Sequence, residues 1–248
     1  MQHHLILYHD WGSTCSQKVR LALAEKGLDY EGRVVRLRHF EHLRSAFLAL
    51  NPEAMVPVLL HDGCVITESS VITEYIDAVF PAPPLLPPDA RGRARVGMWT
   101  RFIDQVTSPA IKKPSFARNL ATHLQAVGAD QVDASTEQMP SLAVRARWRS
   151  AARDGFSAAE LEEAHADLQR TLVRMEVALA SWPWLAGDLY TLADVHMLPF
   201  VERLAHLPPY ALGRDWPAVA AWQARMRARP AFARAQFVDP VSAGAPLA

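Results

Sequence analysis

The sequence has 248 residues, and half of them are hydrophobic. Its 26 basic and 26 acidic residues leave no formal net charge. This balance gives no reason to expect nucleic acid or an anionic membrane as a partner. Two cysteines, Cys15 and Cys64, cannot form a disulfide framework and indicate a reducing compartment. Because no apolar run approaches the ~20 residues of a membrane span and the N-terminus lacks a signal-peptide pattern, we expect a soluble cytoplasmic protein.

Residues 1–80 predict a small α/β domain. Short apolar or alternating runs predict strands, and apolar residues at helical spacing predict helices. The segment His61-Asp62-Gly63 contains the Asp-Gly pair of a tight hairpin turn. Strand–helix–strand at the start implies a parallel crossover, and the hairpin adds an antiparallel edge, so we predict a mixed four-stranded sheet. The predicted strands are 5–8, 30–37, 56–60 and 64–67, and the predicted helices are 15–26, 41–50 and 71–79.

A proline-rich linker, 81–89, separates this domain from a helical domain that we place at 90–248. No convincing strand pattern follows the linker. The stretch 117–141 is weakly patterned and predicts a broken helix or an irregular excursion, and we treat 117–156 as an insertion. Residues 238–248 look frayed. The predicted helices of this domain are 91–106, 145–153, 158–182, 191–204 and 216–227.

Val56-Pro57 is the first of two signals for a ligand that resembles a peptide. Proline cannot donate a hydrogen bond to a strand ladder, so it is expected only at a strand's first residue or on an edge. X–Pro is also the bond at which a cis peptide costs little free energy. A cis bond here would turn the Val56 backbone outward, where an extended ligand can pair with it. The alternative is a proline that merely begins an edge strand.

Glu68-Ser69 is the second signal, at the point where a strand gives way to an apolar helical pattern. Free backbone N–H groups and a hydroxyl at a helix start can hold a carboxylate. The alternative is an ordinary helix cap, which is common for serine. Both signals occur in the right order around a hairpin, and this combination favours a ligand site over either alternative.

The chain resembles the cytosolic glutathione transferases, which join a thioredoxin-like domain to an all-helical one. The resemblance covers nearly the whole chain and rests on the segments 13–21, 56–57, 68–69 and 191–194. It implies glutathione as co-substrate, no metal, and a homodimer. It also implies that Val56, with Met55 and Pro57, pairs with the cysteinyl unit of glutathione. Ser69 would then bind the γ-glutamyl carboxylate, with Glu68 near the ammonium.

The start of the first helix is where the glutathione thiol would be activated. A helix N-terminus and a hydrogen-bond donor lower the pKa of a thiol, which is ~8.5 when unperturbed. Ser13 aligns with the hydroxyl or thiol that many of these enzymes use as the donor, and Ser16 is a rival. Cys15 is either a reactive thiol or a small buried packing residue. We favour the packing residue, and the absence of a Cys-x-x-Cys pair argues against a dithiol oxidoreductase.

Three further polar residues receive roles by the same resemblance. His42, with Arg44 as a rival, is placed to meet the glycine carboxylate, and we assign no metal to it because no third ligand accompanies His39. Asp104 corresponds to an acid that in several relatives reaches glutathione across the dimer interface. It could equally pair with Arg101 on one helix face. The segment 191–194 is a capping box and structural.

The second substrate is expected between the domains, against aromatic and aliphatic side chains that suit an apolar aryl acceptor. Most of these residues could instead belong to the core. The basic run 145–149 is interpreted as a solvated helix face. The candidate pocket residues are Trp11, Phe102, Ile103, Val106 and Phe116, with Ile111 and Trp148 as further members.

The insertion, together with Trp99-Thr100 and Asp104, resembles the bacterial glutathione-dependent β-etherases of lignin breakdown. In those enzymes the glutathione thiolate displaces an aryloxide from a β-aryl ether ketone. Three alternatives stay open. Ser13-Thr14-Cys15 resembles the start of the maleylacetoacetate-type isomerases, Cys15 would suit a glutathione lyase, and the fold can serve as a non-catalytic interaction protein.

Overall fold

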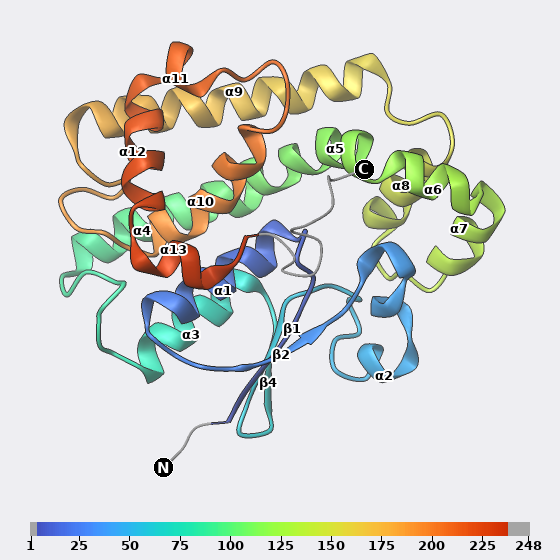
Figure 1. Ribbon diagram of the computed structural model, residues 1–248, viewed down its shortest axis with the longest axis horizontal. Helices are drawn as coiled ribbons and strands as arrows, with labels where there is room; N and C mark the ends of the chain where they lie inside the picture. The colour runs from blue at the N-terminus through green and yellow to red at the C-terminus, as the bar shows by residue number, and fades with distance from the viewer. Residues whose placement is uncertain (1–3, 238–248) are drawn as a thin grey trace.

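The computed structural model describes residues 4–237 and shows an N-terminal sheet below a layer of helices (Figure 1). The predicted frayed end, 238–248, lies outside the described residues. Within the described part of the chain, no helix has both the length and the apolar character that crossing a bilayer requires.

The sheet confirms the predicted mixed arrangement of four strands, in the order β2-β1-β3-β4. β1 runs parallel to β2 and antiparallel to β3, and β3 and β4 form the hairpin. Asp62 and Gly63, in the hairpin turn, both have positive φ, as a primed two-residue turn requires. The strands are β1 (Leu5–His9), β2 (Glu31–Val34), β3 (Val58–His61) and β4 (Cys64–Ile66).

Helices α1 (Thr14–Glu25) and α3 (Ser69–Val79) pack together on the sheet through one apolar cluster. The other face of the sheet carries the short helix α2 (Ser45–Leu48). The continuous helix predicted at 41–50 is wrong. Two single turns, η1 (Leu37–His39) and η2 (Glu41–Leu43), precede α2, because Phe40 between them adopts a left-handed conformation with φ 56°. The sheet-side cluster contains Leu5, Leu7, Val19, Leu23, Leu59, Ile72 and Ile76.

The helical domain has one large apolar core, which is built mainly from α4, α5, α9, α10 and α12. The helix predicted at 91–106 continues through a π-helical turn, 103–107, into α5, and Pro114 is accommodated inside that helix. The bounds are α4 (Ala90–Phe102), η3 (Ile103–Thr107), α5 (Ser108–Asn119), α9 (Ala158–Ser181), α10 (Leu192–Leu204), α11 (Leu212–Asp215), α12 (Pro217–Arg227) and α13 (Pro230–Ala235).

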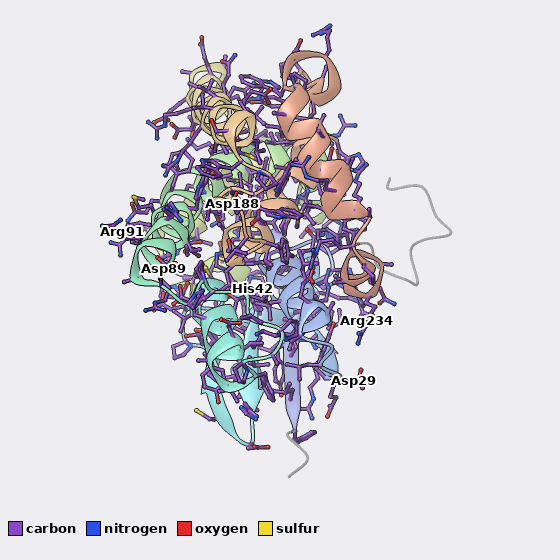
Figure 2. All side chains as sticks on the ribbon, turned by 90° about the vertical axis from the view of Figure 1, so that its left-hand side faces the viewer. Asp29, His42, Asp89, Arg91, Asp188 and Arg234 are labelled. Atoms are coloured by element: carbon purple, nitrogen blue, oxygen red, sulfur yellow. The ribbon has the colours of Figure 1, made fainter. Side chains whose placement is uncertain are left out.

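Helix α1 lies between the sheet and the helical domain, where it contacts α3 on one side and α10 and α13 on the other (Figure 1). Its polar residues therefore find partners far along the chain. The guanidinium of Arg20 donates to the carbonyls of Ala235 and Gln236, each at 3.0 Å. Figure 2 shows Asp29, just after α1, and Arg234 on the same side of the molecule, and their ion pair of 3.8 Å joins the two domains again.

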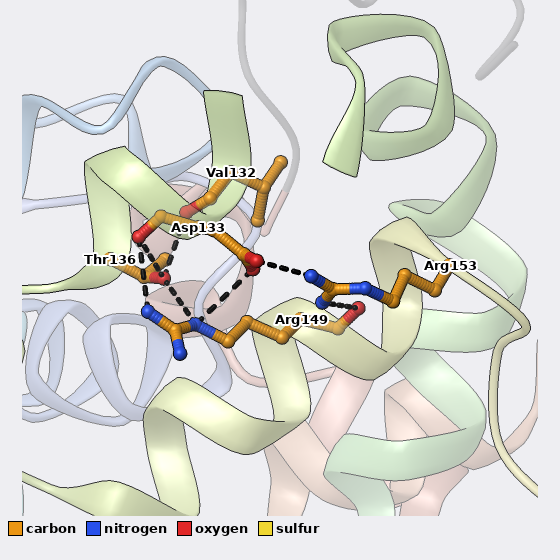
Figure 3. Close-up of polar contacts among 5 residues, drawn as sticks. All are labelled: Val132, Asp133, Thr136, Arg149 and Arg153. Carbon is orange, nitrogen blue, oxygen red and sulfur yellow. Dashed lines mark hydrogen bonds and ion pairs between the residues drawn. The ribbon is translucent and has the colours of Figure 1, made fainter. Parts of the chain in front are cut away.

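The insertion consists of three short helices with an apolar cluster of their own. They lie at one end of the molecule, next to α2 and its preceding turns (Figure 1). Asp133 accepts from Arg149 and Arg153, and these contacts hold the second and third helices together (Figure 3). The segment is a broken helix, which is one of the two predicted alternatives. The helices are α6 (Ala121–Val127), α7 (Ala129–Thr136) and α8 (Leu142–Ala152).

Asp194 is the polar centre of the helical core. The predicted capping box at the start of α10 is confirmed, because Asp194 accepts from the Thr191 N–H while Thr191 caps the helix. Asp194 also accepts from the Leu185 N–H at 3.0 Å and the Trp222 Nε1–H at 2.9 Å. Burial raises the pKa of Asp194 to about 6, although these hydrogen bonds favour the charged form.

Replacing Trp148 tests whether the insertion is an independent unit. Trp148 is 3 % exposed inside the insertion cluster, so Trp148→Ala should destabilise that cluster by about 3–5 kcal/mol. Amide hydrogen exchange should accelerate in α6–α8 and stay unchanged in α9 and α10. Trp182→Ala, at a tryptophan that is 48 % exposed, is the matched control. Equal acceleration throughout the chain would contradict a separate cluster.

The raised pKa of Asp194 predicts a pH-dependent difference between the wild type and Asp194→Asn. The folded-state pKa of about 6 lies above the ordinary value of 3.8, so folding favours the protonated acid. The stability of the wild type relative to the variant is therefore greatest below about pH 4 and falls as the pH rises through 6, by about 3 kcal/mol in all. Urea unfolding of both proteins across this range measures it. A difference independent of pH would refute the assignment.

Candidate functional site

The sheet topology brings the predicted site segments to one edge. β1 ends beside the start of β3, because Tyr8 pairs with Val58 in the antiparallel register. β4 ends at the same edge, since Leu59 pairs with Ile66, and β2 also ends there beside His9. The segments that follow or precede these strand ends therefore gather there. They are 10–13, 35–44, 56–57 and 67–69.

The peptide bond between Val56 and Pro57 is cis, immediately before β3. The Val56 side chain is buried against Val35, Phe47 and Val58, which fixes this loop on the sheet. Asn51 shapes the approach to it, donating from its side-chain amide to the Met55 carbonyl at 2.8 Å. The Val56 backbone is therefore held in place by the apolar packing of its side chain and by the hydrogen bond between Asn51 and Met55 just before it.

Glu68 occupies the position before α3 with φ 64°, which non-glycine residues rarely adopt. Its carbonyl accepts from the Ile72 N–H at 2.8 Å and so begins the helix. The N–H groups of the first turn, from Ser69 onward, have no intrahelical acceptor. Such strain concentrates at functional sites, and here it accompanies a helix start with free donors.

Asp104, which is 42 % exposed, and the buried Lys18 form a polar network beneath this helix start. Lys18 Nζ donates to Ser70 Oγ at 2.9 Å and to Asp104 Oδ1 at 3.1 Å, and Ser70 Oγ donates to Asp104 Oδ2 at 2.6 Å. The Lys18 side chain has no exposed surface. The alternative pairing of Asp104 with Arg101 is wrong, because Asp104 faces the N-terminal domain and helps to fix α3.

Ser13 is the N-cap of α1, and its Oγ accepts from the Ser16 N–H at 3.2 Å. This contact uses a lone pair, so the hydroxyl proton is left to donate elsewhere. Ser16 is fully buried and its Oγ accepts from the Asp10 N–H at 3.3 Å. The geometry therefore favours Ser13 over Ser16 as a donor to a ligand. Cys15 is half-buried at the same helix start, which conflicts with its assignment as a buried packing residue.

His42 is 2 % exposed and stacks on Trp148 of the insertion, with 5.5 Å between ring centroids. Its Nδ1 is buried without a hydrogen-bond partner. Burial lowers the pKa of His42 to about 4, so the imidazole is neutral at pH 7. The rival Arg44 is exposed and lies 3.7 Å from Glu41. Figure 2 places His42 at the level where the N-terminal and helical domains meet.

The predicted pocket residues separate into two groups. Ile103 and Ile111 are buried in the main helical core, and Phe102 packs there with Arg174 4.3 Å from its ring centroid. Ile103 is 0 % exposed and Ile111 is 1 % exposed, which agrees with the core alternative that the sequence left open for these residues. Other members are half-buried. They are Trp11, Val106 and Phe116.

Sequence reasoning missed three cations around the site: Lys18, Lys112 and Arg147. Lys18 stands between Gln17 and Arg20 on the same helix, so the sequence gives no signal that it is buried. Lys112 lies close enough to Cys15 and Glu68 for their charges to raise its pKa, although burial lowers it more. Arg147 belongs to the run that we had interpreted as a solvated face, yet it is half-buried and burial lowers its pKa.

Comparison with known proteins agrees with this geometry. The sequence matches the glutathione S-transferase N-terminal domain over residues 12–79 and the glutathione S-transferase C-terminal domain over residues 137–230. Protein LigF from Sphingobium sp. (strain NBRC 103272 / SYK-6) is 30 % identical over 92 % of this chain and 91 % of LigF. A maleylpyruvate isomerase from Ralstonia sp. is 33 % identical over 84 % of this chain and 88 % of that protein.

The crystal structure of the beta-etherase LigF from Sphingobium sp. strain SYK-6 superimposes with a TM-score of 0.86 and covers 93 % of this chain and 98 % of LigF. The four-stranded sheet, the helical domain and the sequence matches all lead to one assignment, which the sequence resemblance had predicted. The chain belongs to the glutathione S-transferase family.

Proposed function

We propose that this protein is a glutathione transferase that adds the glutathione thiolate to an apolar, aromatic electrophile, with cleavage of a β-aryl ether as its reaction. The proposal rests on one observation, which is that the predicted glutathione-binding segments gather at the same edge of the sheet. The cis Val56-Pro57 segment, the strained Glu68-Ser69 helix start and the Ser13 cap meet there. The similarity to the beta-etherase LigF over almost the whole chain supports the finer assignment.

Each part of this edge suits one part of glutathione. The Val56 backbone can pair with the cysteinyl unit, and the free N–H groups of α3 with the Ser69 hydroxyl can hold the γ-glutamyl carboxylate. The Glu68 carboxylate suits the ammonium, and His42 offers a neutral ring nitrogen for the glycine end. Asp104 supports this set through Lys18 and Ser70. Glutathione is therefore the proposed co-substrate.

The chemistry proposed for the thiol follows from the start of α1. The Ser13 hydroxyl donates to the sulfur, and the positive end of the helix dipole lowers the pKa of the thiol further. The thiolate forms a carbon–sulfur bond with the acceptor carbon as the carbon–oxygen bond of the ether breaks. The electron pair leaves with the aryloxide, which then takes a proton from water. The rate acceleration comes from the orientation of the thiolate toward the acceptor carbon and from the desolvation of the thiolate.

A second candidate is a glutathione-dependent isomerase, favoured by the similarity to maleylpyruvate isomerase and by the segment Ser13-Thr14-Cys15. Such an enzyme adds the thiolate to an enedione and expels it again, so glutathione is not consumed. A consumption screen across aryl halides, β-aryl ethers and enediones separates the two. We propose net consumption with the first two classes.

We also propose that the protein works as a cytoplasmic homodimer. Two free cysteines suit a reducing compartment, and dimerisation is typical of the fold. Sedimentation velocity tests the assembly, and a sedimentation coefficient that fits a single 27.5 kDa chain would contradict it.

Ser13→Ala should impair thiolate formation while leaving glutathione affinity nearly unchanged. Loss of the donor should raise the pKa of bound glutathione by about one unit or more and lower kcat/KM by about a hundredfold or more. Ultraviolet absorbance of the thiolate against pH measures the first effect. Thr14→Ala is the neighbouring control. Normal activity in Ser13→Ala combined with loss in Cys15→Ser would instead support a Cys15-dependent lyase.

Ser69→Ala should weaken glutathione binding by roughly tenfold or more, because a charge-assisted hydrogen bond to the carboxylate is lost. Titration calorimetry with glutathione measures the affinity, and Glu68→Ala should weaken it as well. Ser157→Ala removes a serine from the start of α9 and serves as the matched control. A wild-type protein that fails to bind glutathione at about millimolar concentration would refute the proposed function.

A further inference from the structure

Lys112 and Arg147 are two half-buried cations, and Glu68 and Asp104 act on Lys112 only from beyond ion-pair distance. Among the described residues, neither makes an ion pair or a hydrogen bond to a protein group. Desolvation is the main cause that lowers the pKa of each. Burying a charge without a partner costs free energy, so such a pair is expected where a ligand supplies the opposite charge.

The neighbours of these residues behave differently. Lys113, the next residue on α5, lies 3.6 Å from Glu160 and 3.8 Å from Glu163. Arg149 of α8 and Arg153, directly after it, bind Asp133 (Figure 3). Arg145 of α8 donates to the Met139 carbonyl. The arginine run of α8 therefore stabilises the insertion, with Arg147 as the exception.

Both cations lie on the side of the helical domain that faces the glutathione site. Lys112 and Phe116 are one turn apart on the same face of α5. The guanidinium of Arg147 lies 5.7 Å from the Phe116 ring centroid, which places α8's charge beside that face. Asp104, two turns before Lys112, reaches Lys18 and Ser70 in the N-terminal domain.

Electrostatic contacts give the same location. Burial has the largest effect on the pKa of Lys112 and lowers it, while the nearby groups Cys15, Glu68 and Asp104 raise it and Arg147 lowers it. The Lys112 ammonium therefore lies between the thiol-activating helix start and the insertion. The two carboxylates of glutathione already have proposed positions, at Ser69 and at His42. Lys112 and Arg147 are therefore left to face the second substrate, which accepts the thiolate.

We propose that Lys112 and Arg147 form an anion subsite that binds a carboxylate on the second substrate. The inference rests on the proposed function, in which the acceptor lies over the thiol. It replaces a wholly apolar acceptor with an aromatic compound whose ring is apolar and which also carries a carboxylate. The planar guanidinium can donate to both carboxylate oxygens in a bidentate contact, and the lysine adds a point charge. The Phe116 ring offers an apolar surface for the aryl group beside it.

Calorimetric binding of glutathione conjugates tests the subsite without turnover. The ligands are glutathione, S-benzylglutathione, and the para- and meta-carboxybenzyl conjugates. The proteins are the wild type, Lys112→Met, Arg147→Met, Arg147→Lys, and the control Lys113→Met. Lys112→Met and Arg147→Met should each weaken the binding of at least one of the two carboxybenzyl conjugates by roughly tenfold. The affinities for glutathione and for S-benzylglutathione should change by less than about twofold. Arg147→Lys should recover part of the loss.

The other outcomes overturn the subsite in distinct ways. Equal weakening of all conjugates and of glutathione would assign the cations to a carboxylate of glutathione. A loss of similar size in Lys113→Met would make the effect one of general charge. No change in any variant would leave the pair without a ligand role.

A wild type that binds no glutathione contradicts the proposed function but not the subsite. In that case benzoate alone is the probe, and its binding must still depend on Lys112 and Arg147 and not on Lys113. Thermal unfolding of each variant confirms that the protein folds, so a loss of binding can be assigned to the missing charge.

Discussion

The burial of helix α1 between two domains is the constraint on which the rest of the structure depends. A helix covered on all sides must satisfy its polar side chains from elements far away in the sequence. Glu25 binds the Arg229 guanidinium at 2.7 and 2.8 Å, Arg20 reaches the carbonyls after α13, and Lys18 meets Asp104. Removing one partner from such a contact leaves an uncompensated charge, which is strongly unfavourable. The two domains are therefore held in one relative orientation by the helix that Ser13 caps.

This arrangement explains how a small sheet can position a flexible tripeptide. The ligand-facing backbone segments are short, and each is fixed from behind by side chains that the ligand would not touch. Val56 is anchored in an apolar cluster, and the start of α3 is braced by Lys18 through Ser70. Asp194 plays the equivalent part in the helical domain, where it joins the start of α10 to α12. Pre-organised donors of this kind are worth more than mobile ones, because no reorganisation accompanies binding.

Features with a local cause could be predicted from the sequence, and features that depend on distant contacts could not. A proline at the start of a strand, a serine at a helix start and a Thr-x-x-Asp box carry their meaning within a few residues. The partners of Asp104, Lys18 and Ser70, were not predicted, because they lie 86 and 34 residues away in the sequence. The π-helical turn at 103–107 was not predicted, because apolar periodicity does not reveal a local change of helix type. Arg147 was interpreted as part of a solvated helix face and Lys112 received no role, because the sequence carries no measure of burial.

The separate apolar cluster of the insertion has a consequence for how this protein can change. Residues that share no partners contribute to stability almost additively, whereas residues in one packed cluster are coupled. Helices α6–α8 carry their own cluster and touch the N-terminal domain mainly through aromatic rings such as Trp148 against Phe40 and His42. Substitutions in helices α6–α8 can therefore accumulate with little effect on the stability of the sheet at which glutathione is proposed to bind. Natural variation and laboratory selection for new acceptors are therefore expected to concentrate in helices α6–α8 and to spare the N-terminal sheet.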